Sequence, residues 1–200
     1  MILYLHGFRS SPASYKARVV AARMAALGRA DELLCPQLPA SPRAAMDMAL
    51  ALVDAAMLVN PATDLATDLA IIGSSLGGYY ATWLAERFGC RAVLLNPAVR
   101  PLDSLERHVG VTTAWHSEAP FEFKRDYIDE LRALAVPAIS QPDRYFLLAA
   151  TGDEVLDYRD MLAHYAGARQ HVIAGSDHAI SEFADYVDEV LAFCLPKDGA

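Results

Sequence analysis

Short apolar segments alternate with longer stretches of helical periodicity along most of the chain. Six segments are mainly apolar and bounded by turn residues, which predicts strands at residues 2–5, 32–35, 69–72, 92–95, 145–149 and 171–173. Several of them are apolar throughout instead of alternating with polar residues, as is typical of strands buried on both faces of a sheet.

The intervening stretches carry the spacing expected of helices. These predicted helices cover residues 14–27, 43–60, 76–88, 127–134, 158–165 and 181–193. Pro36, Pro61, Pro97 and Pro137 fall at the expected boundaries. The alternation predicts an α/β fold with a mostly parallel sheet of about six strands flanked by helices. A chain of 200 residues is also a suitable length for one domain, so we expect a single domain over 1–200.

One long segment, residues 97–124, departs from this alternation. Its periodicity is weak, and it carries His108, Trp115, His116, Phe121 and Phe123. Long loops in compact domains are often functional, so the segment could form a small lid that shapes a substrate pocket. It could equally be an irregular cover whose aromatic side chains pack on the core. The pattern favours neither interpretation.

The motif Gly73-Ser74-Ser75-Leu76-Gly77 joins a predicted strand to a predicted helix. It has the G-x-S-x-G pattern of a nucleophile elbow, a sharp turn that exposes a serine hydroxyl. Glycines on both sides of the serine avoid crowding in the turn, where the serine itself takes a strained conformation. Ser75 is therefore the candidate nucleophile. The alternative is a glycine-rich turn that packs tightly and has no chemical role.

A serine nucleophile needs a base to accept its proton, and in this kind of fold the base comes last along the chain. His178 lies in a loop-like segment, 174–178, after the last predicted strand and is the candidate base. The alternative for His178 is a turn histidine that caps the last helix. His164 lies within a predicted helix and His171 at the start of a strand, so both are interpreted as structural.

The acid that orients the base should follow the preceding strand. Asp153 comes directly after residues 145–149 and a short turn, and is the preferred candidate. Asp157 is better placed to cap the helix that begins near residue 158. Glu154 would project differently from Asp153 and is the weaker candidate. Asp177 is too close to His178 in sequence to reach its ring and is interpreted as a turn residue.

Acyl transfer also needs hydrogen-bond donors for the oxyanion. The backbone N–H of Leu76, at the start of the helix behind the elbow, is one candidate. The second is the N–H of Phe8 in the loop after the first strand, where Gly7 lets the backbone approach closely. His6 is a possible alternative base, but its position at the end of the strand favours a role in bracing this loop.

Composition narrows the function classes. Hydrophobic residues make up 54% and charged residues 21% of the chain, which is typical of a globular protein. The net charge of −8 argues against a nucleic-acid partner, and no apolar stretch has the length of a membrane span. The start of the chain lacks the features of a signal peptide, and the three cysteines show no metal-ligand spacing. We therefore expect a cytoplasmic protein that needs no metal or organic cofactor.

Four segments carry a resemblance to a known family: residues 6–17, 73–81, 95–98 and 151–158. Together they resemble the α/β-hydrolase superfamily, and within it the small YqiA/YcfP-like esterase family. The resemblance implies a short, minimal α/β-hydrolase fold with Ser75 as nucleophile, Asp153 as acid and His178 as base. One departure is Ile180, which stands where the family often has an aromatic residue.

These observations predict a serine hydrolase that cleaves carboxylic esters or thioesters through a Ser-His-Asp triad and an acyl-enzyme intermediate. The compact length leaves little chain for a large cap, which favours small-molecule substrates with small to medium acyl groups. The alternative is a binding or scaffolding module without catalysis, because a fold does not fix a function. The sequence does not indicate an oligomeric state.

Overall fold

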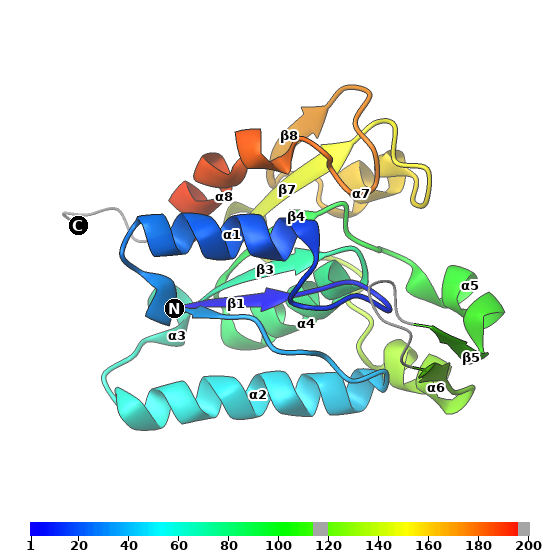
Figure 1. Cartoon of the computed structure of the whole chain (residues 1–200), viewed down its shortest axis with the longest axis horizontal. Coiled ribbons are helices and arrows are strands. Elements are labelled where there is room, and N and C mark those ends of the chain that lie inside the picture. The colour runs from blue at the N-terminus through cyan, green and yellow to red at the C-terminus, as the bar shows by residue number, and fades with distance from the viewer. Residues whose placement is uncertain (114–119, 196–200) are drawn as a thin grey trace.

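A computed structural model describes residues 1–113 and 120–195. Its centre is a six-stranded sheet in the order β2-β1-β3-β4-β7-β8, and every neighbouring pair of strands is parallel (Figure 1). The strands are β1 (Ile2–Leu5), β2 (Leu33–Leu34), β3 (Ala70–Ser74), β4 (Arg91–Leu95), β7 (Tyr145–Ala150) and β8 (Arg169–Ile173). The predicted fold class is confirmed.

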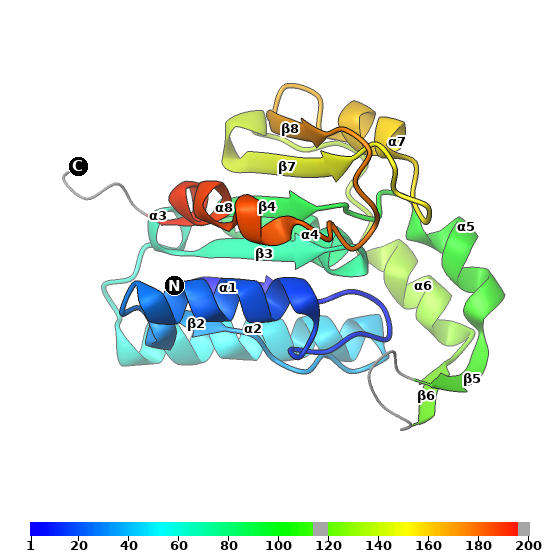
Figure 2. The same ribbon diagram turned by 45° about the horizontal axis from the view of Figure 1, so that its top comes forward.

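The helices cover both faces of this sheet. They are α1 (Tyr15–Ala26), α2 (Pro42–Val59), α3 (Leu65–Asp68), α4 (Leu76–Phe88), α5 (Pro101–Leu105), α6 (Asp126–Ala133), α7 (Tyr158–His164) and α8 (Val187–Cys194). Helices α1 and α8 lie side by side over one face, where their apolar side chains pack on Ile2 and Tyr4 of β1 (Figure 2). Helices α2 and α4 pack on Leu3 and Leu5 from the other face. The central strands are therefore buried on both sides, which explains their continuous apolar sequence.

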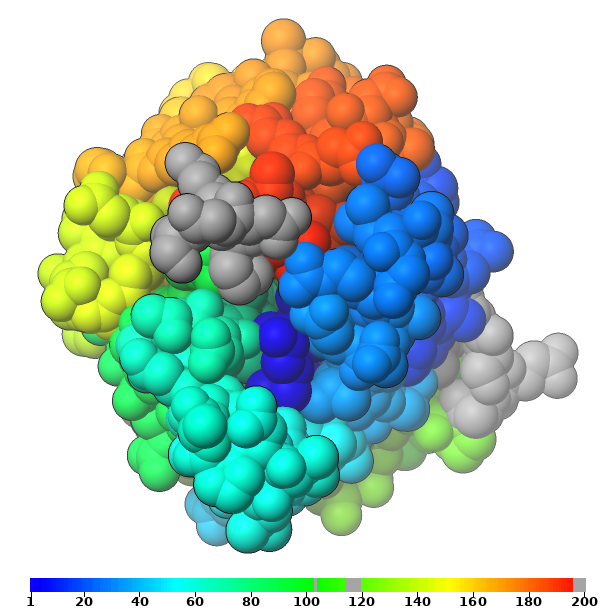
Figure 3. Space-filling view, turned by 90° about the vertical axis from the view of Figure 1, so that its left-hand side faces the viewer, coloured from blue at the N-terminus to red at the C-terminus, as the bar shows by residue number. Residues whose placement is uncertain are grey.

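The two ends of the sheet differ. At the amino ends of the strands, the first residues of the chain are seen between the segment near residue 60 and the turn that follows α1 (Figure 3). There the Met1 ammonium donates a hydrogen bond to the Asp68 carbonyl at 2.8 Å. The carboxyl ends of β1 and β3 point to the side where α5, α6 and β5 lie (Figure 1). Ligand sites of open α/β sheets form at this carboxyl edge.

The segment 97–124 has more regular structure than its sequence indicates. It contains α5, a 3₁₀ turn at Glu106–His108, and an antiparallel hairpin of β5 (Gly110–Thr113) and β6 (Pro120–Phe123). Its rings pack on the Phe8 ring: the centroids of His108, Phe121 and Phe123 lie 5.6, 5.1 and 5.2 Å from it. The other two aromatic residues noted in this segment, Trp115 and His116, lie outside the described residues.

The end of the chain also differs from expectation. The helix predicted over 181–193 is split into a 3₁₀ turn at Phe183–Asp185 and α8, which begins at Val187. Ile180 has a φ of 50°, a left-handed conformation that interrupts a helical path just before this segment. No helix in the described part of the chain is both long and apolar enough to cross a membrane.

Candidate active site

Ser75 sits at the tip of a tight turn between β3 and α4. Its φ of 54° and ψ of −121° place it in a strained backbone region, and its N–H donates to the Leu95 carbonyl at 3.1 Å. The turn requires glycine at position 77, because a Cβ there would lie 2.0 Å from the Leu5 carbonyl oxygen. Close contact between α4 and β1 thus holds the serine at the carboxyl edge of the sheet.

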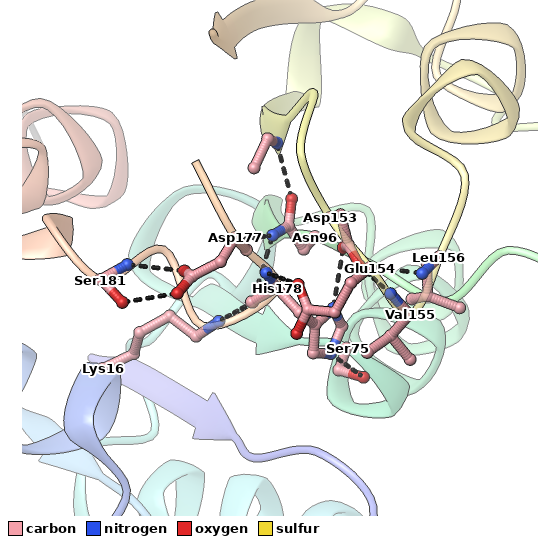
Figure 4. Close-up of polar contacts among 11 residues, drawn as sticks. Lys16, Ser75, Asn96, Asp153, Glu154, Val155, Leu156, Asp177, His178 and Ser181 are labelled. Carbon is pink, nitrogen blue, oxygen red and sulfur yellow. Dashed lines mark hydrogen bonds and ion pairs between the residues drawn. The ribbon is translucent and has the colours of Figure 1, made fainter. Parts of the chain in front are cut away.

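Three side chains from separate parts of the chain meet at this turn (Figure 4). The Ser75 Oγ lies 3.1 Å from His178 Nε2, and His178 Nδ1 lies 2.7 Å from Asp153 Oδ2. The Asp153 side chain is fully buried, whereas that of His178 is 20% exposed. The hydroxyl, imidazole and carboxylate that the sequence predicted to converge are therefore linked by hydrogen bonds.

The loop after β7 fixes the orientation of the Asp153 carboxylate. Its Oδ1 accepts hydrogen bonds from the backbone N–H groups of Val155 and Leu156, both at 2.8 Å. Its Oδ2 is left to accept from His178. In the neutral tautomer that carries its proton on Nδ1 and donates it to the carboxylate, Nε2 can accept the serine proton.

The other acidic candidates have different contacts. Asp157 caps α7 by accepting from the Arg159 N–H at 2.9 Å, as predicted. Asp177 accepts from the N–H and hydroxyl of Ser181, at 2.9 and 2.6 Å, and is a turn residue. Glu154 makes a contact that the sequence did not indicate: its Oε2 accepts from the His178 N–H at 3.0 Å.

The other histidine that could have served as the base, His6, braces the loop after β1. Its Nδ1 lies 3.0 Å from the Gly7 carbonyl, and its Nε2 accepts from the Leu38 N–H at 3.0 Å. These partners require a neutral ring with its proton on Nδ1. Burial lowers the pKa of His6, although the hydrogen bond to Gly7 opposes this effect. The interpretation of His6 as a brace is confirmed.

The candidate oxyanion donors Phe8 and Leu76 line the same small cavity beside the nucleophile. Gly7 forms another part of its wall and lies against Ser75, since a Cβ at Gly7 would be 3.1 Å from the Ser75 Cβ. The cavity has a volume of about 20 Å³, and Leu38 and Tyr80 are among the other residues that line it.

A larger cavity of about 560 Å³ lies between α4, α5 and α7, and neither the three hydrogen-bonded residues nor Phe8 and Leu76 line it. The small cavity is the one beside Ser75, because Gly7, which lies against Ser75, is part of its wall.

Two buried polar side chains near His178 were missed by the sequence reasoning. Lys16 Nζ and Asn96 Nδ2 both donate to the His178 carbonyl oxygen. The one available signal was their position inside segments 6–17 and 95–98, which carry the family resemblance. Nothing in the local hydrophobic pattern indicates that these segments meet the loop at residue 178.

Within residues 1–113 and 120–195, no group of three or more His, Cys, Asp or Glu side chains could hold a metal ion. Cys90 and Cys194 are buried free thiols, and Cys35 is a partly buried one.

Solved structures share this architecture. Est1E from Butyrivibrio proteoclasticus, in its complex with ferulic acid, has a TM-score of 0.69 and 16% sequence identity, covering 96% of this chain and 87% of that one. An esterase from Pyrococcus furiosus has a TM-score of 0.62 and 16% identity, covering 96% and 79%. The esterase domain of a Rhodothermus marinus protein has a TM-score of 0.59 and 17% identity, covering 95% and 83%. At these identities the likeness shows the α/β-hydrolase fold.

The family comparison is more specific than the likeness of folds. One family model matches residues 1–195, which is nearly the whole chain. The protein therefore belongs to the family described as "Uncharacterised protein family (UPF0227)", which is YqiA-like.

Proposed function

We propose that this protein is a serine hydrolase that cleaves carboxylic esters or thioesters. The observation that supports the proposal best is the hydrogen-bonded chain from Ser75 through His178 to the buried carboxylate of Asp153. A serine hydroxyl is a poor nucleophile near neutral pH, and this arrangement supplies the base and the group that orients the base. Each of the three residues comes from a loop at the carboxyl edge of the sheet.

The reaction proceeds in two halves. His178 Nε2 accepts the Ser75 proton as Oγ bonds to the substrate carbonyl carbon, and Asp153 stabilises the resulting imidazolium. The imidazolium then gives its proton to the departing alcohol or thiol, which leaves an acyl group on Ser75. In the second half, His178 accepts a proton from water as the water oxygen attacks the acyl carbon. Return of that proton to Ser75 Oγ releases the carboxylic acid.

The developing oxyanion needs donors that are already in place. We assign the backbone N–H groups of Phe8 and Leu76, because both residues border the small cavity that also contains Gly7. Leu76 is the first residue of α4, where backbone N–H groups point out of the helix and favour negative charge. The Phe8 ring packs edge-to-face against the rings of Phe121 and Phe123, which helps to fix its position.

The same contacts support a role for the segment 97–124 as a small lid. Its β6 strand carries Phe121, which lines the small cavity together with Leu38 and Tyr80. A volume of about 20 Å³ holds only a small group. We therefore propose that short acyl chains are preferred, with the leaving group directed to solvent past the partly exposed ring of His178.

Hydrolysis of a p-nitrophenyl acyl series by purified protein tests the proposal. The Ser75→Ala variant should lose activity by roughly 10⁴-fold or more, because removal of the nucleophile abolishes the acyl-enzyme route. Ser74→Ala removes the adjacent hydroxyl and serves as the matched control, with activity close to wild type. Equal turnover by wild type and Ser75→Ala would reject the proposal, and ligand binding without turnover would favour a binding module.

A further inference from the structure

The backbone of His178 is held on both sides of its Cα, at the N–H and at the carbonyl oxygen. Its carbonyl oxygen accepts hydrogen bonds from Lys16 Nζ at 3.0 Å and Asn96 Nδ2 at 3.2 Å, and its N–H donates to Glu154 Oε2 (Figure 4). Asn96 also donates to the neighbouring carbonyl of Asp177, at 3.0 Å. The short loop therefore has three fixed backbone contacts at His178, the candidate base, and a fourth at the preceding residue.

Asn96 connects this loop to the strand that carries the acid. It is fully buried, and its Oδ1 accepts from the Ala150 N–H at 2.8 Å, at the end of β7 and three residues before Asp153. Its own N–H donates to the Leu148 carbonyl at 3.0 Å. Both ends of the amide are thus used, and they fix the loop of the base relative to the strand of the acid.

Lys16 reaches the same carbonyl from α1, on the opposite side of the sheet from α4. The residue is only 8% exposed, although it carries an ammonium group. Burial lowers its pKa to about 8, against the opposing effect of the Asp153, Asp177 and Glu154 carboxylates. Taking an ammonium group out of water is costly unless it is hydrogen-bonded, and the hydrogen bond to the His178 carbonyl is the contact that offsets this cost.

We propose that Lys16 and Asn96 are positioning residues, which hold the His178 imidazole in reach of both Ser75 and Asp153. This inference rests on the proposed hydrolase function and goes beyond it, because neither side chain touches the nucleophile. The imidazole must keep two hydrogen bonds in line, at 3.1 and 2.7 Å, through each proton transfer. A displacement of about 1 Å at a reacting group can reduce the rate by about 10²-fold.

Two substitutions test this role independently. Lys16→Met keeps the length and apolar stem of the side chain and removes its donor. Asn96→Asp keeps the shape and the acceptor for the Ala150 N–H, and removes both donations to the loop; aspartate also tolerates the φ of 44° found there. Arg18→Met is the matched control for Lys16, because Arg18 is exposed on the same helix.

For p-nitrophenyl acetate, kcat should fall about 10- to 100-fold in each variant, while KM stays within about twofold. The matched control should keep wild-type kcat. A kcat within twofold of wild type in a folded Lys16→Met or Asn96→Asp variant would overturn the proposal. So would an equal loss of kcat in Arg18→Met.

A proton NMR measurement separates this inference from the proposed function. The His178 Nδ1–H, which is bonded to Asp153, should give a low-field signal in wild type that shifts or broadens in both variants. This signal does not depend on turnover. If wild type failed to hydrolyse any ester, the hydrolase proposal would fail, and an unchanged signal in both variants would separately reject the positioning role.

Discussion

Four non-glycine residues in the described part of the chain have a left-handed backbone conformation, and all four lie around the candidate site. Arg9, Ser75, Asn96 and Ile180 have φ values of 59°, 54°, 44° and 50°. Such conformations cost about 1–3 kcal/mol each and persist only where the surrounding structure holds them. Here they belong to the loop after β1, the elbow, the loop after β4 and the turn beside His178. Backbone strain is therefore concentrated where side chains must be aimed with accuracy.

The identity of the acid can be tested at this scale. Asp153→Asn should reduce kcat by about 10⁴-fold, because an amide can favour the wrong imidazole tautomer and cannot stabilise the imidazolium. The variant should fold, since its side-chain oxygen can still accept from Val155 and Leu156. Asp157→Asn, at the cap of α7, is the matched control and should keep most of the activity. Comparable losses of kcat in the two variants would mean that Asp153 is not the carboxylate that orients His178.

Lys16 should make the free energy of unfolding depend on pH. Its pKa is about 8 in the folded protein and about 10.5 when unperturbed, so between these values the unfolded chain binds more protons. The unfolding free energy of wild type, relative to Lys16→Met, should therefore rise with pH across this window, by about 1.4 kcal/mol per pH unit at most. Below pH 8 the difference should be flat.

Urea unfolding at pH 7, 8, 9 and 10 measures this difference. The exposed Arg18→Met substitution should show a constant offset from wild type over the same range. A constant offset for Lys16→Met as well would mean that the buried amine does not lose its proton in the folded protein.

At the scale of elements, the elbow depends on the contact of α4 with β1. Gly77 faces the Leu5 carbonyl so closely that any side chain would collide with backbone. The adjacent β1 in turn carries His6 and Gly7 into the site, so one helix–strand contact fixes both the nucleophile and the oxyanion loop.

Gly77→Ala should therefore destabilise the protein by several kcal/mol or prevent folding, because the collision is with main chain and cannot be relieved by a rotamer change. Gly28→Ala is a suitable comparison: its Cβ would meet no atom within 4 Å, and its φ of 70° should cost only about 1 kcal/mol. Thermal unfolding of the two variants checks the contrast. Similar melting temperatures would mean that α4 can shift away from β1 at little cost.

Some helices and strands could be predicted from the sequence and others could not, and the difference has physical reasons. The strands flanking Ser75 and Asp153 are buried on both faces, and their uninterrupted apolar residues make them easy to find. Strand β2 has only two residues, and α5 and the β5–β6 hairpin lie in a segment without clear periodicity. The last helix was predicted too long, because the chain first forms a separate 3₁₀ turn at Phe183–Asp185, with Phe183 buried in the core, and α8 begins only at Val187.

At the scale of the whole molecule, the parallel sheet brings distant residues to one edge. Ser75, Asp153 and His178 follow β3, β7 and β8, and their order along the chain was enough to predict that they meet. The hydrogen bonds from Lys16 and Asn96 to the His178 carbonyl were not predictable in this way. Lys16 and Asn96 come from a helix and a loop that meet only because α1 and β4 pack against the C-terminal region.

Substrate size is a property of the assembled molecule, since the small cavity combines the loop after β1, the segment around Leu38 and the β6 strand. We expect rates on p-nitrophenyl esters to be highest for acetyl and to fall by hexanoyl. Leu38→Ala should enlarge the cavity and shift the preference to longer chains, because the buried side chain forms part of the wall. Leu58→Ala, at an exposed position on α2, is the control. Rates that rise steadily to long chains in wild type would contradict this reading of the cavity.

The most direct test of the central claim is covalent labelling of Ser75 by a fluorophosphonate, located by peptide mass spectrometry. Folded wild type should carry one adduct, on Ser75, and labelling should be slowed by at least about 10²-fold in His178→Ala, since the base activates the hydroxyl. An absence of adduct on Ser75 in folded wild type, or labelling that is equally fast without His178, would contradict it.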